Sequence, residues 1–573
     1  MPLLAKHRPS CACESPPPLL PTLTLRPPRR RFYRLQRHVA ALVLLAFAAG
    51  PAAPPASAVP QSGSGSLPSL GDYWDLTAAA ERRIGERIAA SIYRDPDYVD
   101  DPVLSEYVQG IWQPLLQAAR VRGELSAELD ERFSWQFFLI RDRSVNAFAL
   151  PGGYFGVHLG LIASVTSRDE LAAVLGHEMS HVTQRHIARL MTQQSRQTPW
   201  LLAAMVLGIL AASKSPSAAN AAIVGGQALA IQNQLGFSRD MEREADRVGF
   251  GLMTDAGFES RGVASMFEKL QQASRLNDNG AFAYLRSHPL NTERIAEAQA
   301  RVQLATSSAP AATAAQALTA AQGRLLQAMM AARARLLAAP GVDAQRAMVA
   351  QAQGRGLDTP AAAASSAVSR DPRDLRDLAA QQAGALYAGA LAAAQLRDFA
   401  VARALLSTLK PRLSGHALAN TAFVLLGVEL DLMEGKVPAA AASADASLMR
   451  GLLTRAEVLV MGRALLAAQR PTEVVSRLQV WVAERPKDAA AWQLLSAAYT
   501  AQGEPVRAIR ADAESRLAEL DLPAALDRFK AAQGVMRNTP GQTDYVEGSI
   551  IDTRVRQTEL WIKQQALQDK IDR

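Results

Sequence analysis

The segment LGHEMSHVTQRH, at residues 175–186, contains the residue types that bind and use a catalytic metal ion. An α-helix turns about 100° per residue, so His177 and His181 lie on one face and can hold one cation. Zinc is the usual ion for such a pair, one per chain. Glu178 leans over the same site and can take a proton from a water that the metal activates. The segment therefore predicts a zinc-dependent hydrolase; the alternative is a chance motif with two solvated histidines.

The third histidine of the segment, His186, does not fit the pattern of a ligand. It lies nine residues after His177, which puts it on the opposite face of a continuous helix. An extended zinc motif of the HExxHxxGxxH type would need a glycine at 184 and a histidine at 187, where this chain has Gln184 and Ile187. We therefore expect His186 to be a surface or packing histidine.

A third metal ligand is expected from the segment EREAD at residues 242–246. Glu242 and Asp246 are four residues apart and share a helix face, whereas Glu244 points elsewhere. The Glu242 carboxylate would complete a site of two histidines and one glutamate, as in zinc hydrolases. Asp246 is placed to accept an imidazole N–H or to handle a proton. Taken alone, the segment also fits two solvated charges on an arginine-rich helix.

The surrounding sequence predicts the elements that position these side chains. Ser167 and Glu170 form a capping box that starts a helix over about 168–192, and 238–253 reads as a second helix. Helical spacing also runs through 72–130. Three extended runs are expected to form a small sheet: FSWQFFLI (133–140), AFAL (147–150) and YFGVHLGLI (154–162).

The charge of the chain excludes nucleic acid as a partner. Of the net charge of +8, residues 1–58 carry +7, so the rest of the 573-residue chain is nearly neutral. Those first residues resemble a signal peptide: an arginine-rich stretch, the apolar run AALVLLAFAAG (40–50), and a cleavage site at Ala56-Ser57-Ala58. Export to the periplasm is expected, and a retained N-terminal anchor is the weaker alternative. Both cysteines, Cys11 and Cys13, precede the cleavage site, so no disulfide is expected in the exported protein.

Two apolar runs within 200–231 are each too short for an ordinary transmembrane helix. They predict a helical hairpin, either packed on the domain or lying at a membrane surface or over the active site.

The C-terminal half repeats with a period of about 34 residues, typical of tetratricopeptide repeats. Gly427, Gly462 and Ser496 occupy equivalent positions, and Trp492 and Pro486 match two others. A generic helical bundle is the alternative. The expected domains are a signal peptide (1–58), a zinc peptidase domain (59–305), a linker with a helical segment (306–382), tetratricopeptide-like repeats (383–530) and a helical tail (531–573).

These motifs together resemble the gluzincin-type zinc peptidases that include HtpX and the CAAX prenyl proteases, peptidase family M-48. The resemblance rests on HEMSH, EREAD, His288-Pro289 with Arg294, and NAFALPGGYFGVHLGLI (146–162). It implies an α+β peptidase domain, mostly helical with a small sheet, followed by an all-α tetratricopeptide-repeat solenoid. It also implies zinc on His177, His181 and Glu242.

The same resemblance implies roles for the other site residues. Glu178 would be the base and Asp246 a proton donor or a partner of a ligand, and AFAL would be an edge strand that pairs with an extended substrate. His288 would occupy the open zinc position and hold the enzyme inactive, or it is only a histidine at a helix start. Arg294 would stabilise an oxyanion or pair with an acid; the sequence leaves this open.

The resemblance, the signal peptide and the repeats imply a periplasmic endopeptidase that acts on misfolded or stalled outer-membrane proteins. The repeats would dock substrates or the barrel-assembly machinery, and residues 200–231 would supply any peripheral membrane contact. One alternative is a chaperone or scaffold with a largely autoinhibited metal site. Another is an integral-membrane peptidase.

Overall fold

A computed structural model describes residues 76–194, 238–276, 282–308, 314–354, 372–449, 453–538 and 544–571. All of them belong to one unit, Tyr73–Arg573. The expected signal peptide (1–58) and the apolar runs within 200–231 lie outside the described residues. Among the helices that are described, none has the length and apolar character needed to span a bilayer.

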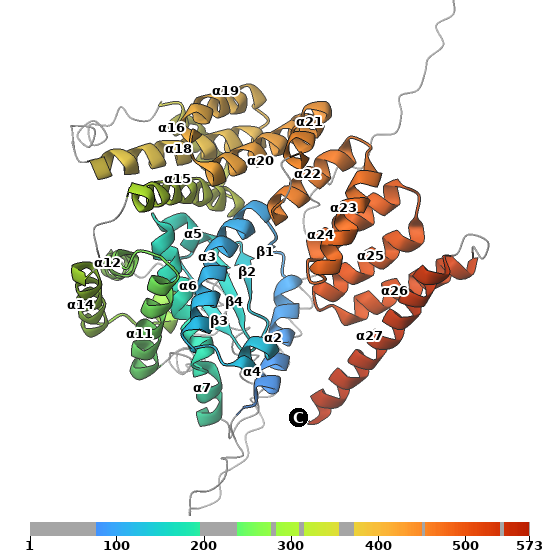
Figure 1. The fold of residues 1–573 in the computed structure, drawn as a ribbon, viewed down its shortest axis with the longest axis horizontal. Coiled ribbons are helices and arrows are strands. Elements are labelled where there is room, and N and C mark those ends of the chain that lie inside the picture. The colour runs from blue at the N-terminus through green and yellow to red at the C-terminus, as the bar shows by residue number, and fades with distance from the viewer. Residues whose placement is uncertain are drawn as a thin grey trace, which may run out of the picture. The chain divides into compact units, whose positions relative to one another are not determined.

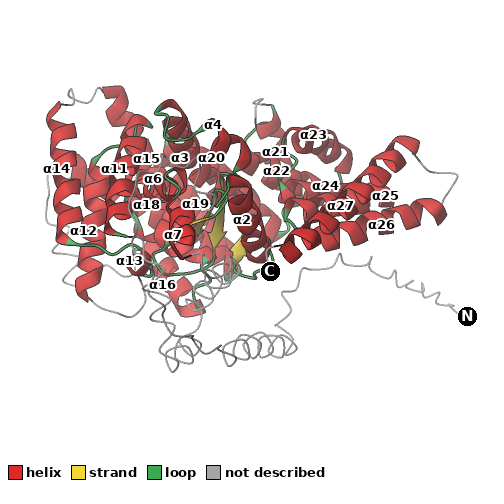
Figure 2. Ribbon diagram, turned by 90° about the horizontal axis from the view of Figure 1, so that it is seen from below, coloured by secondary structure: helices red, strands yellow, loops and turns green. Residues whose placement is uncertain are grey.

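A small mixed sheet lies at the centre of the N-terminal part (Figure 2). Its strands are β1 (Tyr98–Val99), β2 (Gln136–Ile140), β3 (Ala147–Leu150) and β4 (Tyr154–His158), in the order β1-β2-β4-β3. β2 and β4 run parallel, and the other neighbours are antiparallel. The turn between β3 and β4 uses Gly152 and Gly153 at φ of 74° and 77°, a backbone region that favours glycine. In this strand order AFAL is an edge strand, as expected. YFGVHLGLI is a strand only to His158 and continues as helix α5 (Leu159–Ser164).

Helices cover both faces of this sheet. The N-terminal part contains α2 (Ala78–Tyr93), α3 (Pro102–Val121), α4 (Ala127–Arg132), α6 (Arg168–Thr183), α7 (His186–Gln194), α11 (Arg239–Asp255), α12 (Arg261–Leu276), α13 (Tyr284–Ser287) and α14 (Thr292–Ser308). On one face Ile84 and Ile88 of α2 pack with Phe138 and Tyr154. On the other face Phe155 packs into a core shared with α3 and α6. The alternating side chains of the strands thus fix the motif helix α6 against the sheet.

The motif helix is shorter than the expected 168–192. Its start at Arg168 matches the expectation, and the Ser167 hydroxyl accepts the N–H of Glu170 at 3.2 Å. The expected capping box is not completed, because the Glu170 carboxylate accepts from the N–H of Thr166 at 2.7 Å. It ends at Thr183, and a new helix begins at His186. Arg185 adopts a left-handed φ of 55° and is held there by an ion pair with the buried Glu81. The prediction of one continuous helix was therefore wrong. Nothing in the sequence indicates the break, because it has no glycine or proline there.

Helices also form most of the described C-terminal half, and from α18 onward each packs against a neighbour in sequence (Figure 1). They are α15 (Ala314–Leu337), α16 (Val342–Ala352), α18 (Pro372–Gln395), α19 (Phe399–Leu409), the 3₁₀ turn η1 (Lys410–Leu413), α20 (Ala417–Glu434), α21 (Val437–Leu448), α22 (Arg455–Ala467), α23 (Pro471–Glu484), α24 (Ala489–Ala501), α25 (Pro505–Ala518), α26 (Leu522–Asn538) and α27 (Tyr545–Ile571). The described chain is therefore mostly helical with a small sheet, as expected. α15 packs against α5 and α18 through buried side chains such as Met329 and Met330.

Candidate metal centre

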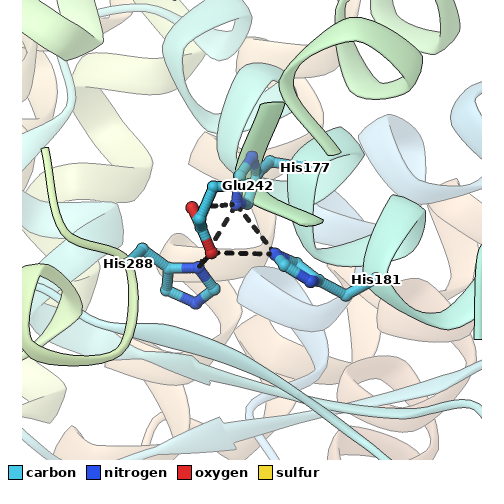
Figure 3. A group of neighbouring side chains, drawn as sticks. All are labelled: His177, His181, Glu242 and His288. Carbon is cyan, nitrogen blue, oxygen red and sulfur yellow. Dashed lines mark hydrogen bonds and ion pairs between the residues drawn. The ribbon is translucent and has the colours of Figure 1, made fainter. Parts of the chain in front are cut away.

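Four side chains from three parts of the chain meet at one buried point (Figure 3). His177 and His181 come from α6, Glu242 from α11, and His288 follows α13 directly. One nitrogen or oxygen atom from each lies within 4.8 Å of the others. The Nε2 atoms of His177 and His181 are 3.0 Å apart, and Glu242 Oε1 lies 3.5 Å from His181 Nε2. The structure thus brings together the three expected ligands and the expected fourth.

A close crossing of α6 and α11 allows this meeting. Gly176 of α6 faces Gly249 of α11, and a Cβ at Gly249 would lie 2.9 Å from backbone atoms of Gly176 and His177. Any larger side chain would force the two backbones apart and draw Glu242 away from the histidines. Ser238 starts α11 by accepting the N–H of Met241, which fixes Glu242 in the first turn.

Asp246 and Arg294 lie next to the cluster and contact its ligands. His177 Nδ1 lies 3.0 Å from Asp246 Oδ1, which leaves its Nε2 facing the centre. Arg294 donates to both oxygens of Asp246 at 2.7 and 2.9 Å and lies 2.8 Å from Glu242 Oε2. Of the two roles left open for Arg294, the structure shows the pairing with acids. Burial raises the pKa of Asp246, but hydrogen bonds from Arg294 and His177 outweigh it and keep that pKa below its ordinary value.

The centre favours positive charge. Burial alone would lower the pKa of His177, but Asp246 and Glu242 outweigh it and raise that pKa to about 10. Burial raises the pKa of Glu242, but His288 and His177 outweigh it and hold that pKa far below its ordinary value. The ionised Glu242 attracts a cation, and a bound metal ion would displace the proton of His177, because only a neutral imidazole can be a ligand.

Glu178 lies beside this cluster with its carboxylate ready for a further partner. Both of its oxygens are buried, and among the described residues neither makes a hydrogen bond. His288 Nε2 lies 3.3 Å from Glu178 Oε1. Burial raises the pKa of Glu178, and His288 and His177 oppose the shift. Buried carboxylate oxygens are rarely left without partners, so this pair fits a water held at the neighbouring metal position.

The donor set fits zinc. Three imidazoles and one carboxylate are ligands that zinc accepts in four-coordinate sites. His177, His181 and Glu242 would hold the ion, and His288 lies close enough to be a fourth donor. His288 Nδ1 lies 2.9 Å from Glu242 Oε1 and 3.3 Å from His177 Nε2. Its ring stacks on Tyr284 with centroids 4.6 Å apart, a contact that no sequence motif indicated.

His186 is placed differently from the expectation. It is not part of the four-residue cluster and it is fully buried, which agrees with the packing alternative, but it does not lie on the face away from the site. Because α6 ends at Thr183, the chain turns back and His186 Nδ1 comes to 2.9 Å from His181 Nδ1. Its Nε2 lies 3.0 Å from Glu244 Oε2, so Glu244, which was expected to point elsewhere, supports the site indirectly. Only a bend that the sequence does not mark makes these contacts possible.

Comparison with known proteins matches the central part of this chain to a peptidase family. A family model described as Peptidase family M48 matches residues 107–302. The β-barrel assembly-enhancing protease of Escherichia coli is 30% identical over 272 residues, which cover 47% of this chain and 53% of that protein. The protein of that name from Yersinia pestis is 27% identical over 455 residues, covering 78% and 83%. The mitochondrial metalloendopeptidase OMA1 of Arabidopsis thaliana is 33% identical over 164 residues, covering 29% and 31%. The chain spans about half the length of the Escherichia coli relative.

Proposed function

We propose that this chain, which contains a domain of Peptidase family M48 over residues 107–302, is a zinc-dependent endopeptidase of the periplasm. One observation carries the proposal: His177, His181 and Glu242 converge on one point, with the buried carboxylate of Glu178 beside it. A structural zinc site needs no carboxylate beside the ligands, whereas a hydrolytic site needs one as a base. Export to the periplasm rests on the arginine-rich and apolar start of the sequence.

The chain's own residues can supply the steps of peptide hydrolysis. A zinc ion at the three donors would activate a water and polarise the scissile carbonyl. Glu178 would accept the proton of that water and return it to the leaving amine. Asp246 would hold His177 with its Nε2 toward the centre, and Arg294 would keep Asp246 and Glu242 in place.

The edge strand β3 offers a way to bind substrate without strict sequence preference. β3 pairs with β4 on one side and has no strand on the other within the described sheet. A polypeptide could add there as a further strand, held by backbone hydrogen bonds. Unfolded chains expose such backbone, so misfolded or stalled outer-membrane proteins are suitable substrates. The names of two bacterial relatives, both β-barrel assembly-enhancing proteases, support this substrate class.

His288 is proposed to hold the enzyme in a resting state. Its ring lies among the ligands and contacts both Glu242 and Glu178, so it occupies the space that water and substrate need. Substitution of His288 by alanine is expected to raise the cleavage rate of an unfolded outer-membrane porin by about tenfold or more, equivalent to about 1.4 kcal/mol. The rate is measured with the exported protein loaded with zinc, by gel and by mass spectrometry of the fragments.

The same assay separates the peptidase from the chaperone or scaffold alternative. A chelator should abolish cleavage by the His288→Ala protein, and added zinc should restore it. A His416→Ala variant, changed at a half-buried histidine at the start of α20, serves as the matched control and should behave as wild type. A zinc-loaded His288→Ala protein that leaves the porin intact would refute the peptidase proposal, and protection of the porin from aggregation would then favour the chaperone.

We further propose that the helical half is a tetratricopeptide-repeat solenoid that docks substrate. Support comes from a cavity of about 620 Å³ lined by α2 and by the helices from α25 to α27. Its lining includes the cations Arg82, Arg83, Arg87, Lys487 and Arg554 against two acids, with apolar walls such as Leu517 and Trp561. Burial and the nearby Arg82 lower the pKa of Lys487, which makes no ion pair among the described residues. Such a cavity suits an acidic stretch of an unfolded polypeptide.

Charge reversal tests this docking site. Lys487→Glu is expected to weaken binding of an acidic, unfolded porin segment by about tenfold, measured by fluorescence anisotropy at low salt. Lys563→Glu makes the same charge change at an exposed position of α27 outside the cavity and should have little effect. Equal affinities for the two variants would remove the cavity from the proposal. Binding of the barrel-assembly machinery to the repeats is proposed on the resemblance alone, and peripheral membrane contact through 200–231 is proposed on the apolar runs in that part of the sequence.

A further inference from the structure

A chain of three side chains leads from a proposed metal ligand to a carboxylate. His181 Nδ1 lies 2.9 Å from His186 Nδ1, and His186 Nε2 lies 3.0 Å from Glu244 Oε2. The three residues come from α6, α7 and α11, and Glu244 lies 58 residues after His186 in the sequence. His181 and His186 are both fully buried. Arg189, one turn after His186, holds the same Glu244 oxygen at 2.7 Å.

The direction of these hydrogen bonds is fixed by chemistry. An ionised carboxylate can only accept, so His186 Nε2 must donate its proton to Glu244. A neutral imidazole has one N–H, so His186 Nδ1 then accepts, and His181 Nδ1 must donate. The lone pair of His181 is left on Nε2, the atom that lies 3.0 Å from His177 Nε2 at the centre.

Each of the two proposed histidine ligands is thus connected by hydrogen bonds to a carboxylate, one directly and the other through a second imidazole. His177 donates from Nδ1 directly to a carboxylate, Asp246, at 3.0 Å. His181 reaches its carboxylate, Glu244, through one intervening imidazole. The left-handed Arg185 makes the second arrangement possible, because a continuous helix would put His186 on the far side. A strained residue kept in place by an ion pair with the buried Glu81 is consistent with a functional demand on the bend.

We propose that His186 is a positioning residue that couples Glu244 to His181 and fixes His181 in the tautomer whose Nε2 faces the metal. This proposal rests on the metal site proposed above. A histidine that only filled space would not need both of its ring nitrogens placed in this way. One nitrogen of His186 accepts from a ligand histidine, and the other donates to a carboxylate. Partners of this kind orient a ligand and raise its basicity, so their loss weakens metal binding.

Metal affinity of the full chain tests the proposal. His186→Leu is expected to lower zinc affinity by about 10–100-fold, measured by competition with a chromophoric chelator. His186→Gln should recover most of it, because the amide can accept from His181 and donate to Glu244. His158→Leu is the matched control: His158 is also buried, with its Nδ1 3.0 Å from the Ser144 hydroxyl, but it is absent from the metal cluster. It should leave zinc affinity unchanged.

A second variant and a second measurement keep the test decisive. If His186→Leu does not fold, Glu244→Ala carries the test, because Glu244 is partly exposed, with Glu293→Ala as the control. Glu244→Ala should also weaken zinc binding, and histidine-selective ¹⁵N spectra of the metal-free protein should show His181 as the Nδ1–H tautomer only when His186 and Glu244 are present. Unchanged zinc affinity in the folded variants would overturn the positioning role. Failure of the wild type to bind zinc at all would overturn the proposed function instead.

Discussion

Replacement of Glu178 by glutamine in the His288→Ala protein is expected to lower kcat/KM by about 10²–10⁴-fold while zinc affinity stays the same. Glutamine has nearly the same shape as glutamate but cannot take a proton from the attacking water. Glu178 is absent from the cluster of ligand atoms, so the metal should not be lost with it. The split between a large loss of rate and an unchanged affinity distinguishes a base from a ligand.

A variant of a metal ligand should behave differently from Glu178→Gln. Glu242→Gln should lower zinc affinity and rate together, because Glu242 lies among the ligand atoms and helps neutralise the cation. Glu293→Gln, the same chemical change at an exposed ion pair with Arg243, should alter neither. If the Glu178→Gln enzyme retained most of its rate, Glu178 would not be the base, and proton transfer would have to be assigned to another residue.

The core of the site could be predicted from sequence because its geometry is local. Helix periodicity alone places His177 beside His181 and Glu242 beside Asp246. The same rule misplaced His186, because it assumes an unbroken helix. The break depends on Arg185, whose left-handed backbone is held by Glu81 from α2, about one hundred residues earlier in the sequence.

Contacts between distant segments could not be predicted from one sequence. The ring of Tyr284 contacts that of His177, more than 100 residues earlier in the sequence, with centroids 6.3 Å apart. The packing of α15 against α5 depends on buried residues more than 150 positions apart, such as Gln327, whose side chain donates to the carbonyl of Ile162. A helical segment flanked by alanine- and serine-rich stretches gives no local sign that it belongs to a shared core.

The largest effect on stability is expected from Arg333, which joins the peptidase part to the helical half. Its guanidinium is buried and pairs with Asp101 at the start of α3 and with Glu429 of α20, at distances of 2.6–2.8 Å. It also donates to the Tyr387 hydroxyl of α18 at 3.2 Å. Arg333→Met would leave two carboxylates without a cation, and we expect the free energy of unfolding to fall by about 3–5 kcal/mol. Arg346→Met, at an exposed ion pair with Asp343, is the control and should change it little.

The pH dependence of this loss identifies its cause. Without Arg333, the carboxylates of Asp101 and Glu429 would be charges with no cation to compensate them. A protonated carboxyl group carries no charge, so the destabilisation should be smaller in acid than at neutral pH. Urea denaturation of wild type and Arg333→Met at pH 4 and pH 7 should therefore give the larger difference at pH 7. Equal differences at both pH values would mean that lost packing of the long side chain, not the unpaired carboxylates, destabilises the variant.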